Sequence, residues 1–232
     1  MDNVLVTGAS RGLGLAIAEK LAADGFHVIA VARKAGEKRE GVTPVAFDLS
    51  DVAAIPDFVR SLRQQFGPLY GLVNNAGGST EGLLATMPDP DIEALIRLNT
   101  LSPIMLSKYV TRGMLAQGRG RVVNISSIVA SHGFNSLSVY SATKAALIGF
   151  TRSLAREMGR VGVTVNAIAP GFIDTELTKG LGEEGRDKIV ARSALRRLAE
   201  PQDVAAMAAF LMGEGARNIT GTVMTVDAGG TA

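Results

Sequence analysis

The run Val4-Leu-Val-Thr-Gly-Ala-Ser-Arg-Gly-Leu-Gly14 joins a short apolar strand to a helix through a turn that contains three glycines. Glycine has no Cβ, so the backbone can turn sharply there and approach a ligand closely. The helix behind the turn offers unpaired N–H groups and positive dipole density, which suit a pyrophosphate. The spacing, Gly-x-x-x-Gly-x-Gly, also occurs in simple tight strand–helix connections. Because the turn follows the first predicted strand, we interpret it as a nucleotide site.

Short apolar runs alternate with longer amphipathic segments along the chain. Nearly continuous apolar character is typical of parallel strands covered by helices on both faces. The alternation predicts an α/β Rossmann fold, with a doubly wound seven-stranded parallel sheet between two helical layers. The expected strands span residues 4–6, 27–32, 44–47, 69–74, 121–126, 164–168 and 222–226. The expected helices span residues 13–23, 53–65, 92–116, 138–158 and 202–212.

The sequence predicts a single dinucleotide-binding and catalytic domain over residues 1–232, because no linker or low-complexity tract interrupts the alternation. The exception is segment 172–200, which is rich in glycine and charge and contains a possible short helix at 186–194. Long segments of this kind often act as lids or binding loops. We expect a substrate lid at 172–200, with a solvated surface loop as the alternative.

The composition argues against several classes of function. Of 232 residues, 47% are hydrophobic and the net charge is only +2, so no electrostatic footprint for nucleic acid is expected. Cysteine is absent and there are two histidines, which leaves no thiolate or histidine cluster for a metal. No signal peptide is evident, and no apolar stretch approaches the roughly 20 residues of a membrane span. The sequence predicts a cytoplasmic protein without a metal site or a membrane segment.

The end of the second predicted strand bears on the identity of the dinucleotide. NAD sites usually place a carboxylate there for the ribose 2′-hydroxyl, whereas an arginine accommodates the 2′-phosphate of NADP. The chain reads Ala32-Arg33-Lys34, and Arg11 in the glycine turn can reach the same place. These cations favour NADP(H) over NAD(H). The alternative is that Arg33 and Lys34 are ordinary loop charges.

Tyr140 and Lys144 lie four residues apart, so one helix face would carry both side chains. An ammonium near a phenol favours the phenolate and lowers the pKa of the phenol from about 10. A tyrosine placed in this way can exchange protons near neutral pH. Tyr-x-x-x-Lys also occurs by chance on many helices, so the pair gains its weight from Ser127 and from the glycine-rich turn.

Together these motifs resemble the short-chain dehydrogenase/reductase family over essentially the whole chain. The matching elements are Thr7-Gly-x-x-x-Gly-x-Gly14, Asp48-Leu49, Asn74-Asn-Ala-Gly77, Asn99, Ser127, Tyr140-x-x-x-Lys144 and Pro170-Gly171. The glycine spacing and the ending Ile219-Thr-Gly…Val226-Asp-Ala-Gly-Gly230 most resemble the 3-oxoacyl-[acyl-carrier-protein] reductases of fatty acid biosynthesis. The resemblance implies an NADPH-dependent ketoreductase acting on a 3-oxoacyl thioester, linked to acyl carrier protein or coenzyme A, or on a similar β-keto compound. A dehydrogenase of a secondary alcohol or diol, and a non-catalytic nucleotide-sensing scaffold, are the alternatives.

The resemblance also implies catalytic roles. Tyr140 would protonate the carbonyl oxygen as hydride arrives, and Ser127 would hydrogen-bond the same oxygen. Lys144 would hold the nicotinamide ribose and bias Tyr140, while Asn99 would anchor a water that links Lys144 to solvent. The expected coenzyme contacts are Gly8, Ser10, Arg11, Gly12, Leu13 and Gly14 at the pyrophosphate, Arg33 at the 2′-phosphate, Asp48 and Leu49 at the adenine, Asn75 and Gly77 at the adenosine, Tyr140 and Lys144, and Ile173 and Thr175 at the carboxamide.

Some of these residues have competing interpretations. Ser126 adjoins Ser127, but alternation along a strand lets only one of them face the tyrosine, and the family spacing favours Ser127. His132 has no Gly-x-Ser-x-Gly elbow to support a hydrolase interpretation. Asn99 is alternatively a mark of local helix irregularity. Asp48 and Asp51 are not interpreted as a carboxylate pair, because Ser50 or Asp51 is expected to cap the next helix.

One departure from the family pattern concerns carrier-protein docking. Gly118 and Val161 stand where the fatty-acid reductases carry basic docking residues, although Arg119 and Arg160 are adjacent. Small ketones and coenzyme A thioesters are therefore alternatives to a substrate on acyl carrier protein. Family members commonly assemble through the two long helices and the last strand, which implies a homotetramer, with a homodimer as the alternative.

Overall fold

Seven parallel strands form one sheet in the order β3-β2-β1-β4-β5-β6-β7 in the computed structural model, which describes residues 1–173 and 182–232. The strands are β1 (Asn3–Thr7), β2 (His27–Ala32), β3 (Val42–Ala46), β4 (Leu69–Asn74), β5 (Gly120–Ile125), β6 (Val163–Pro170) and β7 (Val223–Val226). The helices are α1 (Gly12–Ala23), α2 (Ile55–Phe66), α3 (Asp89–Ile96), α4 (Ser102–Gln117), α5 (Ser138–Met158), α6 (Gly182–Arg192) and α7 (Pro201–Met212). The predicted Rossmann architecture is confirmed.

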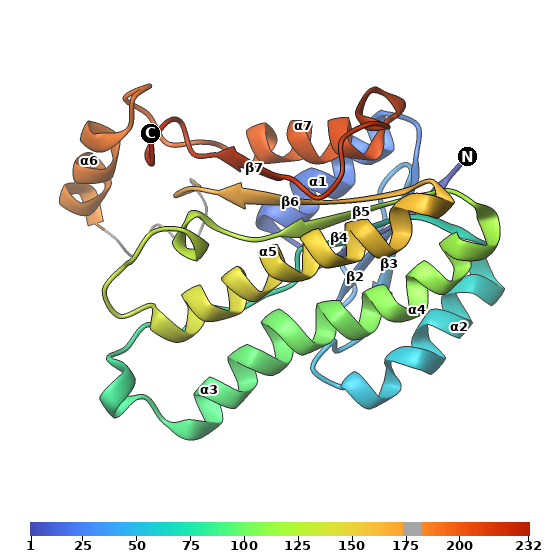
Figure 1. Ribbon diagram of the computed structural model, residues 1–232, viewed down its shortest axis with the longest axis horizontal. Helices are drawn as coiled ribbons and strands as arrows, with labels where there is room; N and C mark the ends of the chain where they lie inside the picture. Colours follow the sequence, from blue (N-terminus) through green and yellow to red (C-terminus); the bar gives the residue numbers. More distant parts are fainter. Residues whose placement is uncertain (174–181) are drawn as a thin grey trace.

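Two hydrophobic layers enclose the sheet (Figure 1). On one face, α1 and α7 pack on the central strands around a cluster that includes Ile17 and Val204. On the other face, α2, α4 and α5 enclose a second cluster that includes Leu62, Leu106 and Leu154. Burial of both faces explains why the central strands read as unbroken apolar runs rather than as alternating ones.

The topology locates the ligand crevice. From β1 the chain adds β2 and β3 on one side and then returns to add β4 on the other side of β1. The carboxyl ends of β1 and β4 therefore flank the point where the strand order reverses, and open α/β sheets bind ligands at such a switch point. Thr7 and Asn74 end these two strands.

One expected helix differs in detail from the structure. Residues 92–116 do not form one regular helix, because a π-helical turn at Arg97–Leu101 separates α3 from α4. Pro103, in the first turn of α4, lacks the N–H that an α-helix would direct back to residue 99. The missing donor gives the helix a local reason to widen at this turn. π-Turns of this kind often mark functional sites.

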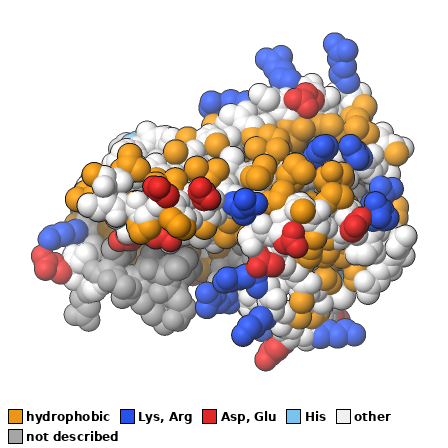
Figure 2. Space-filling model, turned by 90° about the horizontal axis from the view of Figure 1, so that it is seen from below, with side chains coloured by type: hydrophobic (Ala, Val, Ile, Leu, Met, Phe, Trp, Pro, Cys, Tyr) orange, Lys and Arg blue, Asp and Glu red, His pale blue; other side chains and the backbone are white. Residues whose placement is uncertain are grey.

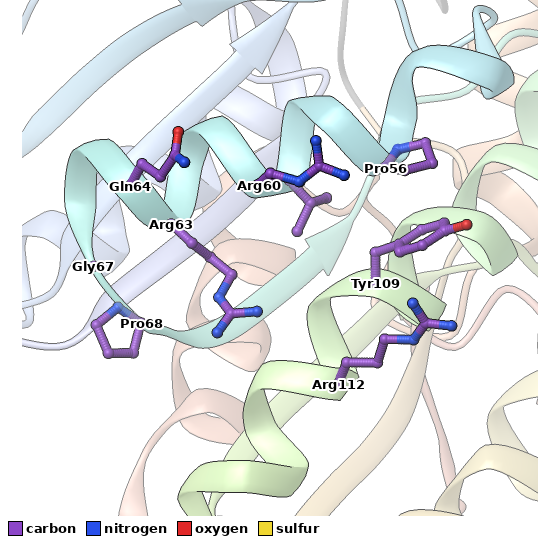
Figure 3. A pocket seen from close by; sticks show the side chains of 9 residues that line it. Pro56, Arg60, Arg63, Gln64, Gly67, Pro68, Tyr109 and Arg112 are labelled. Atoms are coloured by element: carbon purple, nitrogen blue, oxygen red, sulfur yellow. The ribbon is translucent and has the colours of Figure 1, made fainter.

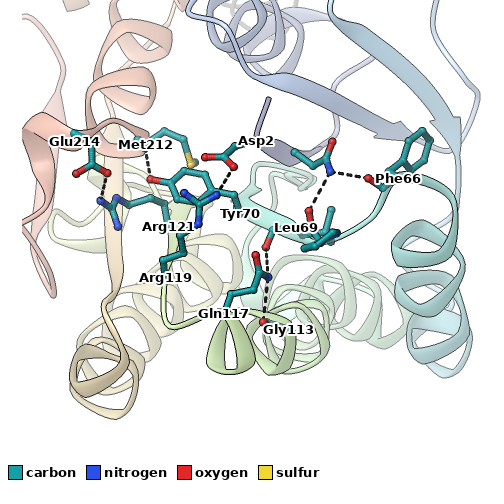
Figure 4. Close-up of polar contacts among 12 residues, drawn as sticks. Asp2, Phe66, Leu69, Tyr70, Gly113, Gln117, Arg119, Arg121, Met212 and Glu214 are labelled. Carbon is teal, nitrogen blue, oxygen red and sulfur yellow. Dashed lines mark hydrogen bonds and ion pairs between the residues drawn. The ribbon is translucent and has the colours of Figure 1, made fainter.

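The amino ends of the strands are occupied by structural pairing (Figure 4). Arg121 on β5 is buried and pairs with Glu214 at 3.2 Å. The hydroxyl of Tyr70 on β4 donates to the carbonyl of Met212 at 3.2 Å. These contacts fasten the end of α7 to the sheet, on the edge opposite the switch point. Within the described residues, no helix is long and apolar enough to cross a membrane.

Candidate active site

The glycine-rich turn after β1 depends on two of its glycines for close packing. Gly8 has a φ of +66°, and a Cβ on it would lie 2.9 Å from the Cα of Ala76. A Cβ on Gly14 would collide with the carbonyl oxygen of Gly8. Gly12 also has a positive φ, +56°, but no neighbouring atom restricts it. The turn is therefore held tightly against both the loop after β4 and the start of α1.

Thr7 ties the two loops of the crevice together. Its hydroxyl donates to the carbonyl of Val73 at 3.2 Å and accepts from the backbone N–H groups of Asn75 and Ala76, both at 2.9 Å. The side-chain amide of Asn75 donates back to the carbonyl of Thr7 at 2.9 Å and to that of Gly8 at 3.4 Å. Asn75, expected beside the adenosine, thus also braces the turn.

The residues expected around the adenosine end lie at the carboxyl ends of β2 and β3. Arg33 is exposed, and its charge helps to hold the pKa of Asp48 below its usual value. The larger causes of this lowered pKa are hydrogen bonds from the hydroxyl and backbone of Ser50. Leu49 is buried next to them. Asp51 caps the following turn by accepting from the N–H of Ala54 at 3.2 Å, so the capping interpretation is confirmed.

Three further residues expected at the site, Asn99, Gly77 and Lys144, lie close together. Asn99 is buried on the π-turn, and its side-chain amide accepts from the backbone N–H of Gly78 and donates to the carbonyl of the same residue. A Cβ on Gly77 would lie 3.2 Å from Asn99 Oδ1 and 3.4 Å from Lys144 Nζ. The absence of a side chain at residue 77 therefore lets the loop after β4 reach both polar groups.

Ser127 and Tyr140 meet at the carboxyl end of β5. The Ser127 hydroxyl lies beside the Tyr140 phenol and lowers the pKa of that phenol, while the Ser126 hydroxyl is buried and donates to the carbonyl of Lys144 at 2.8 Å. The expectation that Ser127 rather than Ser126 faces the tyrosine is confirmed. The Lys144 ammonium lies 5.7 Å from the centre of the Tyr140 ring and donates to the carbonyl of Ile125 at 2.9 Å.

The pKa shifts correct one expectation from the sequence. Burial raises the pKa of the Tyr140 phenol, and the hydrogen bond with Ser127 only partly opposes this effect. Burial also lowers the pKa of Lys144 to about 8. The expected lowering of the phenol pKa by the ammonium is therefore wrong for this structure. Loss of water is the largest cause of both shifts, because desolvation disfavours the charged form of each group.

The segment expected to form a lid is partly anchored. Ile173 is buried and pairs with Ala199 in an isolated bridge. The hydroxyl of Ser193 donates to the carbonyl of Ala228 at 2.7 Å, which fastens the end of the segment to the C-terminal turn. Helix α6 begins and ends earlier than the predicted helix at 186–194. Thr175 lies outside the described residues.

A family model described as Enoyl-(Acyl carrier protein) reductase matches residues 8–231. The chain belongs to the short-chain dehydrogenase/reductase family of oxidoreductases. It is 40% identical to the 3-oxoacyl-[acyl-carrier-protein] reductase FabG of Escherichia coli, over 97% of this chain and 95% of that protein. It is 37% identical to the 3-oxoacyl-[acyl-carrier-protein] reductase MabA of Mycobacterium tuberculosis, over 98% of this chain and 92% of that protein.

Solved structures of similar shape include two in which NADP is bound. ElxO with NADP bound has a TM-score of 0.91 and 32% identity, over 98% of each chain. A gluconate 5-dehydrogenase from Burkholderia cenocepacia, in complex with NADP and tartrate, has a TM-score of 0.94 and 27% identity. That similarity covers 99% of this chain and 95% of the dehydrogenase.

A buried polar network under the site of this short-chain dehydrogenase/reductase was not foreseen from the sequence. The amide of Asn74 donates to Asn124 at 2.8 Å and to Ser107 at 3.0 Å, and Asn124 donates to Thr151 at 2.9 Å. The network links β4 and β5 to α4 and α5. The available signal was an asparagine near the end of each of two apolar strands, because a buried amide needs partners.

Proposed function

We propose that this chain is an NADPH-dependent ketoreductase, which transfers hydride to the carbonyl of a 3-oxoacyl thioester or a similar β-keto compound. The observation that carries the proposal is the proximity of the Ser127 hydroxyl to the Tyr140 phenol, with Lys144 one helical turn away. These groups lie at the same edge of the sheet as the glycine-rich turn. Two hydroxyl groups aimed at one point suit a carbonyl oxygen that gains negative charge.

Each polar group has a distinct task in this mechanism. NADPH, when bound, supplies the hydride. Tyr140 keeps its proton at neutral pH, because burial raises its pKa, and so donates that proton to the oxygen of the substrate. Ser127 donates a hydrogen bond to the same oxygen. Lys144, charged below a pH of about 8, would orient the ribose of the coenzyme beside Tyr140. Asn99 fixes the loop beside Lys144 through Gly78 and remains the expected anchor for a water.

The crevice fits a dinucleotide with a 2′-phosphate. Gly8 and Gly14 give the backbone its tight turn at the start of α1, where a pyrophosphate is favoured. Arg11 and Arg33 are both exposed, and no carboxylate follows β2 in their place. NADP is bound in the similar structures of ElxO and of the gluconate 5-dehydrogenase. The remaining expected contacts belong to this proposal: Ser10, Gly12, Leu13, Asp48, Leu49, Asn75, Gly77 and Ile173, with Thr175 outside the described residues.

The substrate class rests on the sequence relatives. FabG and MabA are named as reductases of 3-oxoacyl groups on acyl carrier protein. We extend that class to this chain, with coenzyme A thioesters included because Gly118 and Val161 replace the expected docking residues. Phe134 and Phe172 meet edge to face at 5.9 Å near the start of segment 172–200, which gives the proposed lid an apolar wall for an alkyl chain.

A dehydrogenase of a polyhydroxy acid is the second candidate. The similarity in shape to a gluconate 5-dehydrogenase, at a TM-score of 0.94, favours it. The sequence identity of 27% to that enzyme, against 40% to the reductase of Escherichia coli, favours the ketoreductase.

We also propose a homotetramer in the cytoplasm. Leu101 and Leu115 of the helix α3–α4 region are exposed apolar side chains that assembly would cover.

Turnover of NADPH with purified protein tests the function. We expect reduction of acetoacetyl-coenzyme A and of longer 3-oxoacyl thioesters, followed through the loss of NADPH absorbance. Tyr140→Phe should lower kcat about a hundredfold or more, with coenzyme binding retained, because it removes the proton donor. Tyr70→Phe, which removes a hydroxyl at the opposite edge of the sheet, is the matched control. Faster oxidation of gluconate than reduction of every 3-oxoacyl thioester would favour the second candidate.

A further inference from the structure

A pocket of about 480 Å³ lies between α2 and α4, away from the catalytic crevice (Figure 3). It includes Gly67 and Pro68, which precede β4, so it opens near the amino ends of the strands. Arg60 and Arg63 enter it from α2, and Arg112 enters from α4. Three guanidinium groups therefore share one small pocket that no step of the proposed reaction uses.

Two of the three guanidinium groups in this arginine pocket, those of Arg63 and Arg112, are not balanced by a carboxylate among the described residues. No aspartate or glutamate belongs to its lining. Among the described residues, no carboxylate lies within 4.0 Å of Arg63 or Arg112, whereas Arg60 pairs with Asp57 at 2.8 Å on the exposed side of α2. Positive charges gathered on a concave wall make the local electrostatic potential more positive, and this potential attracts an anion. Figure 2 shows Lys and Arg side chains around hydrophobic ones on the face that carries these helices.

Residues of α4 pack against the guanidinium groups of Arg63 and Arg112. Arg63 lies against Gly113 of α4, where an added Cβ would be 3.7 Å from the Arg63 Cζ and Nε atoms. Arg112 Cζ is 4.9 Å from the centre of the Tyr109 ring, as in a cation–π contact. A planar guanidinium held in this way loses little further entropy when it binds a phosphate with two parallel hydrogen bonds.

We infer that the arginine pocket binds a small anion that carries two adjacent phosphate groups. Its volume exceeds what one phosphate fills, and its two guanidinium groups without a carboxylate partner, those of Arg63 and Arg112, match the charge of a diphosphate better than that of a single carboxylate. Arginine forks recognise phosphate oxygens in pairs, whereas the small pocket offers no extended groove for a peptide. The ligand would bridge α2 and α4 and hold these two helices together. Each helix follows a segment of the proposed site: α2 follows the loop at Asp48, and α4 follows the π-turn with Asn99.

Calorimetric titration with inorganic pyrophosphate tests this site, at constant ionic strength and both with and without saturating NADP⁺. The variants are Arg63→Ala, Arg112→Ala and the double substitution, and Arg217→Ala is the control at an exposed arginine elsewhere. We expect each single variant to bind pyrophosphate about tenfold or more weakly, because charge-assisted hydrogen bonds to phosphate are lost. The control should bind like the natural chain. Melting temperatures measured in parallel show whether each variant is folded.

The inference requires that the affinity for pyrophosphate depends on Arg63 and Arg112, both with and without NADP⁺ in the catalytic crevice. The inference is overturned if pyrophosphate does not bind, or if all variants bind it equally. Complete loss of binding in the presence of NADP⁺ would also overturn it, because the pyrophosphate would then occupy the coenzyme crevice. Binding of hexaglutamate without binding of pyrophosphate would assign the pocket to an acidic peptide instead.

Discussion

Asn99 pairs with both the backbone N–H and the carbonyl of Gly78, as a residue of a neighbouring antiparallel strand would. Its Oδ1 accepts from the N–H of Gly78 at 2.9 Å, and its Nδ2 donates to the carbonyl of Gly78 at 2.8 Å. Because the π-turn places Asn99 towards the sheet, one buried side chain fixes the loop after β4 beside Lys144. The π-turn therefore contributes to the proposed site, because it carries the side chain that holds the loop in place beside Lys144.

Asn99→Asp tests this pairing. Aspartate keeps the acceptor for Gly78 but replaces the donating amide by an oxygen that faces the Gly78 carbonyl. We expect a loss of about 1–3 kcal/mol in the free energy of unfolding, because buried oxygens are left unpaired. Urea unfolding measures this loss, and kcat should fall with it because the loop beside Lys144 loosens.

Thr143→Val is the graded control for Asn99→Asp. It removes the weaker contact of Asn99, in which Nδ2 lies 3.2 Å from the Thr143 hydroxyl, and leaves the pairing with Gly78 intact. It also removes the hydrogen bond that this hydroxyl donates to the carbonyl of Tyr140 at 2.7 Å. Its effect on kcat should be smaller. Equal effects of the two substitutions would argue against a specific role for the Gly78 peptide.

The pKa of Lys144 predicts a dependence of stability on pH. Burial lowers that pKa to about 8 in the folded chain, against about 10.4 for an unfolded lysine. Between these values the unfolded chain binds more protons at this residue, so its contribution to stability increases with pH. The free energy of unfolding of the natural chain, relative to Lys144→Met, should therefore rise between about pH 8 and pH 10 and be flat below about pH 7.

Urea unfolding at each pH measures this difference. Lys144→Met also leaves the carbonyl of Ile125 without its donor, but that offset does not change with pH. Measurements should end near pH 10, because the raised pKa of Tyr140 contributes with the opposite sign above it. Lys34→Met, at an exposed position, should leave the slope unchanged. A flat difference from pH 8 to pH 10 would show that Lys144 is not desolvated as described.

Gly14→Ala tests the packing of the glycine-rich turn. The added Cβ would meet the carbonyl oxygen of Gly8, so the turn must move away from α1. We expect a loss of about 1–3 kcal/mol in stability, as for other overpacked positions, together with weaker coenzyme binding. Thermal unfolding and fluorescence titration with NADPH measure the two effects.

Gly149→Ala is the matched control within a helix. No atom lies within 4 Å of the position that its Cβ would take, so alanine should stabilise α5 by about 0.5–1 kcal/mol. Gly14→Ala and Gly149→Ala thus have opposite expected signs. If Gly14→Ala proved neutral, the close approach of α1 to the turn would not matter for binding.

The sequence predicted the seven parallel strands and most element boundaries because local patterns determine them. Strand 69–74 and helix 138–158 match the structure residue for residue. The third strand was predicted to begin at Pro44, but it begins at Val42. Proline is tolerated inside β3 because β3 is an edge strand that pairs only with β2. Edge position is a property of the assembled sheet, so local pattern could not supply it.

The candidate site was predicted less completely than the fold. Motif spacing identified Ser127, Tyr140 and Lys144, which the structure brings together. It gave the wrong direction for the pKa of the phenol, because that direction depends on burial in three dimensions. The hydroxyl of Thr7, which joins both loops of the crevice, had no signal beyond its place in the motif.

Arg33→Asp tests the proposed selection of NADPH. Arg33 is exposed at the end of β2, near enough to Asp48 to lower the pKa of that carboxyl. The substitution replaces a cation that would contact the 2′-phosphate by a carboxylate that suits a ribose 2′-hydroxyl. We expect kcat/KM for NADPH to fall about ten- to a hundredfold, while the value for NADH changes much less. Lys38→Asp makes the same charge change in the same loop and should alter neither preference strongly. Equal losses with both coenzymes after Arg33→Asp would assign Arg33 to the fold of the loop rather than to phosphate recognition.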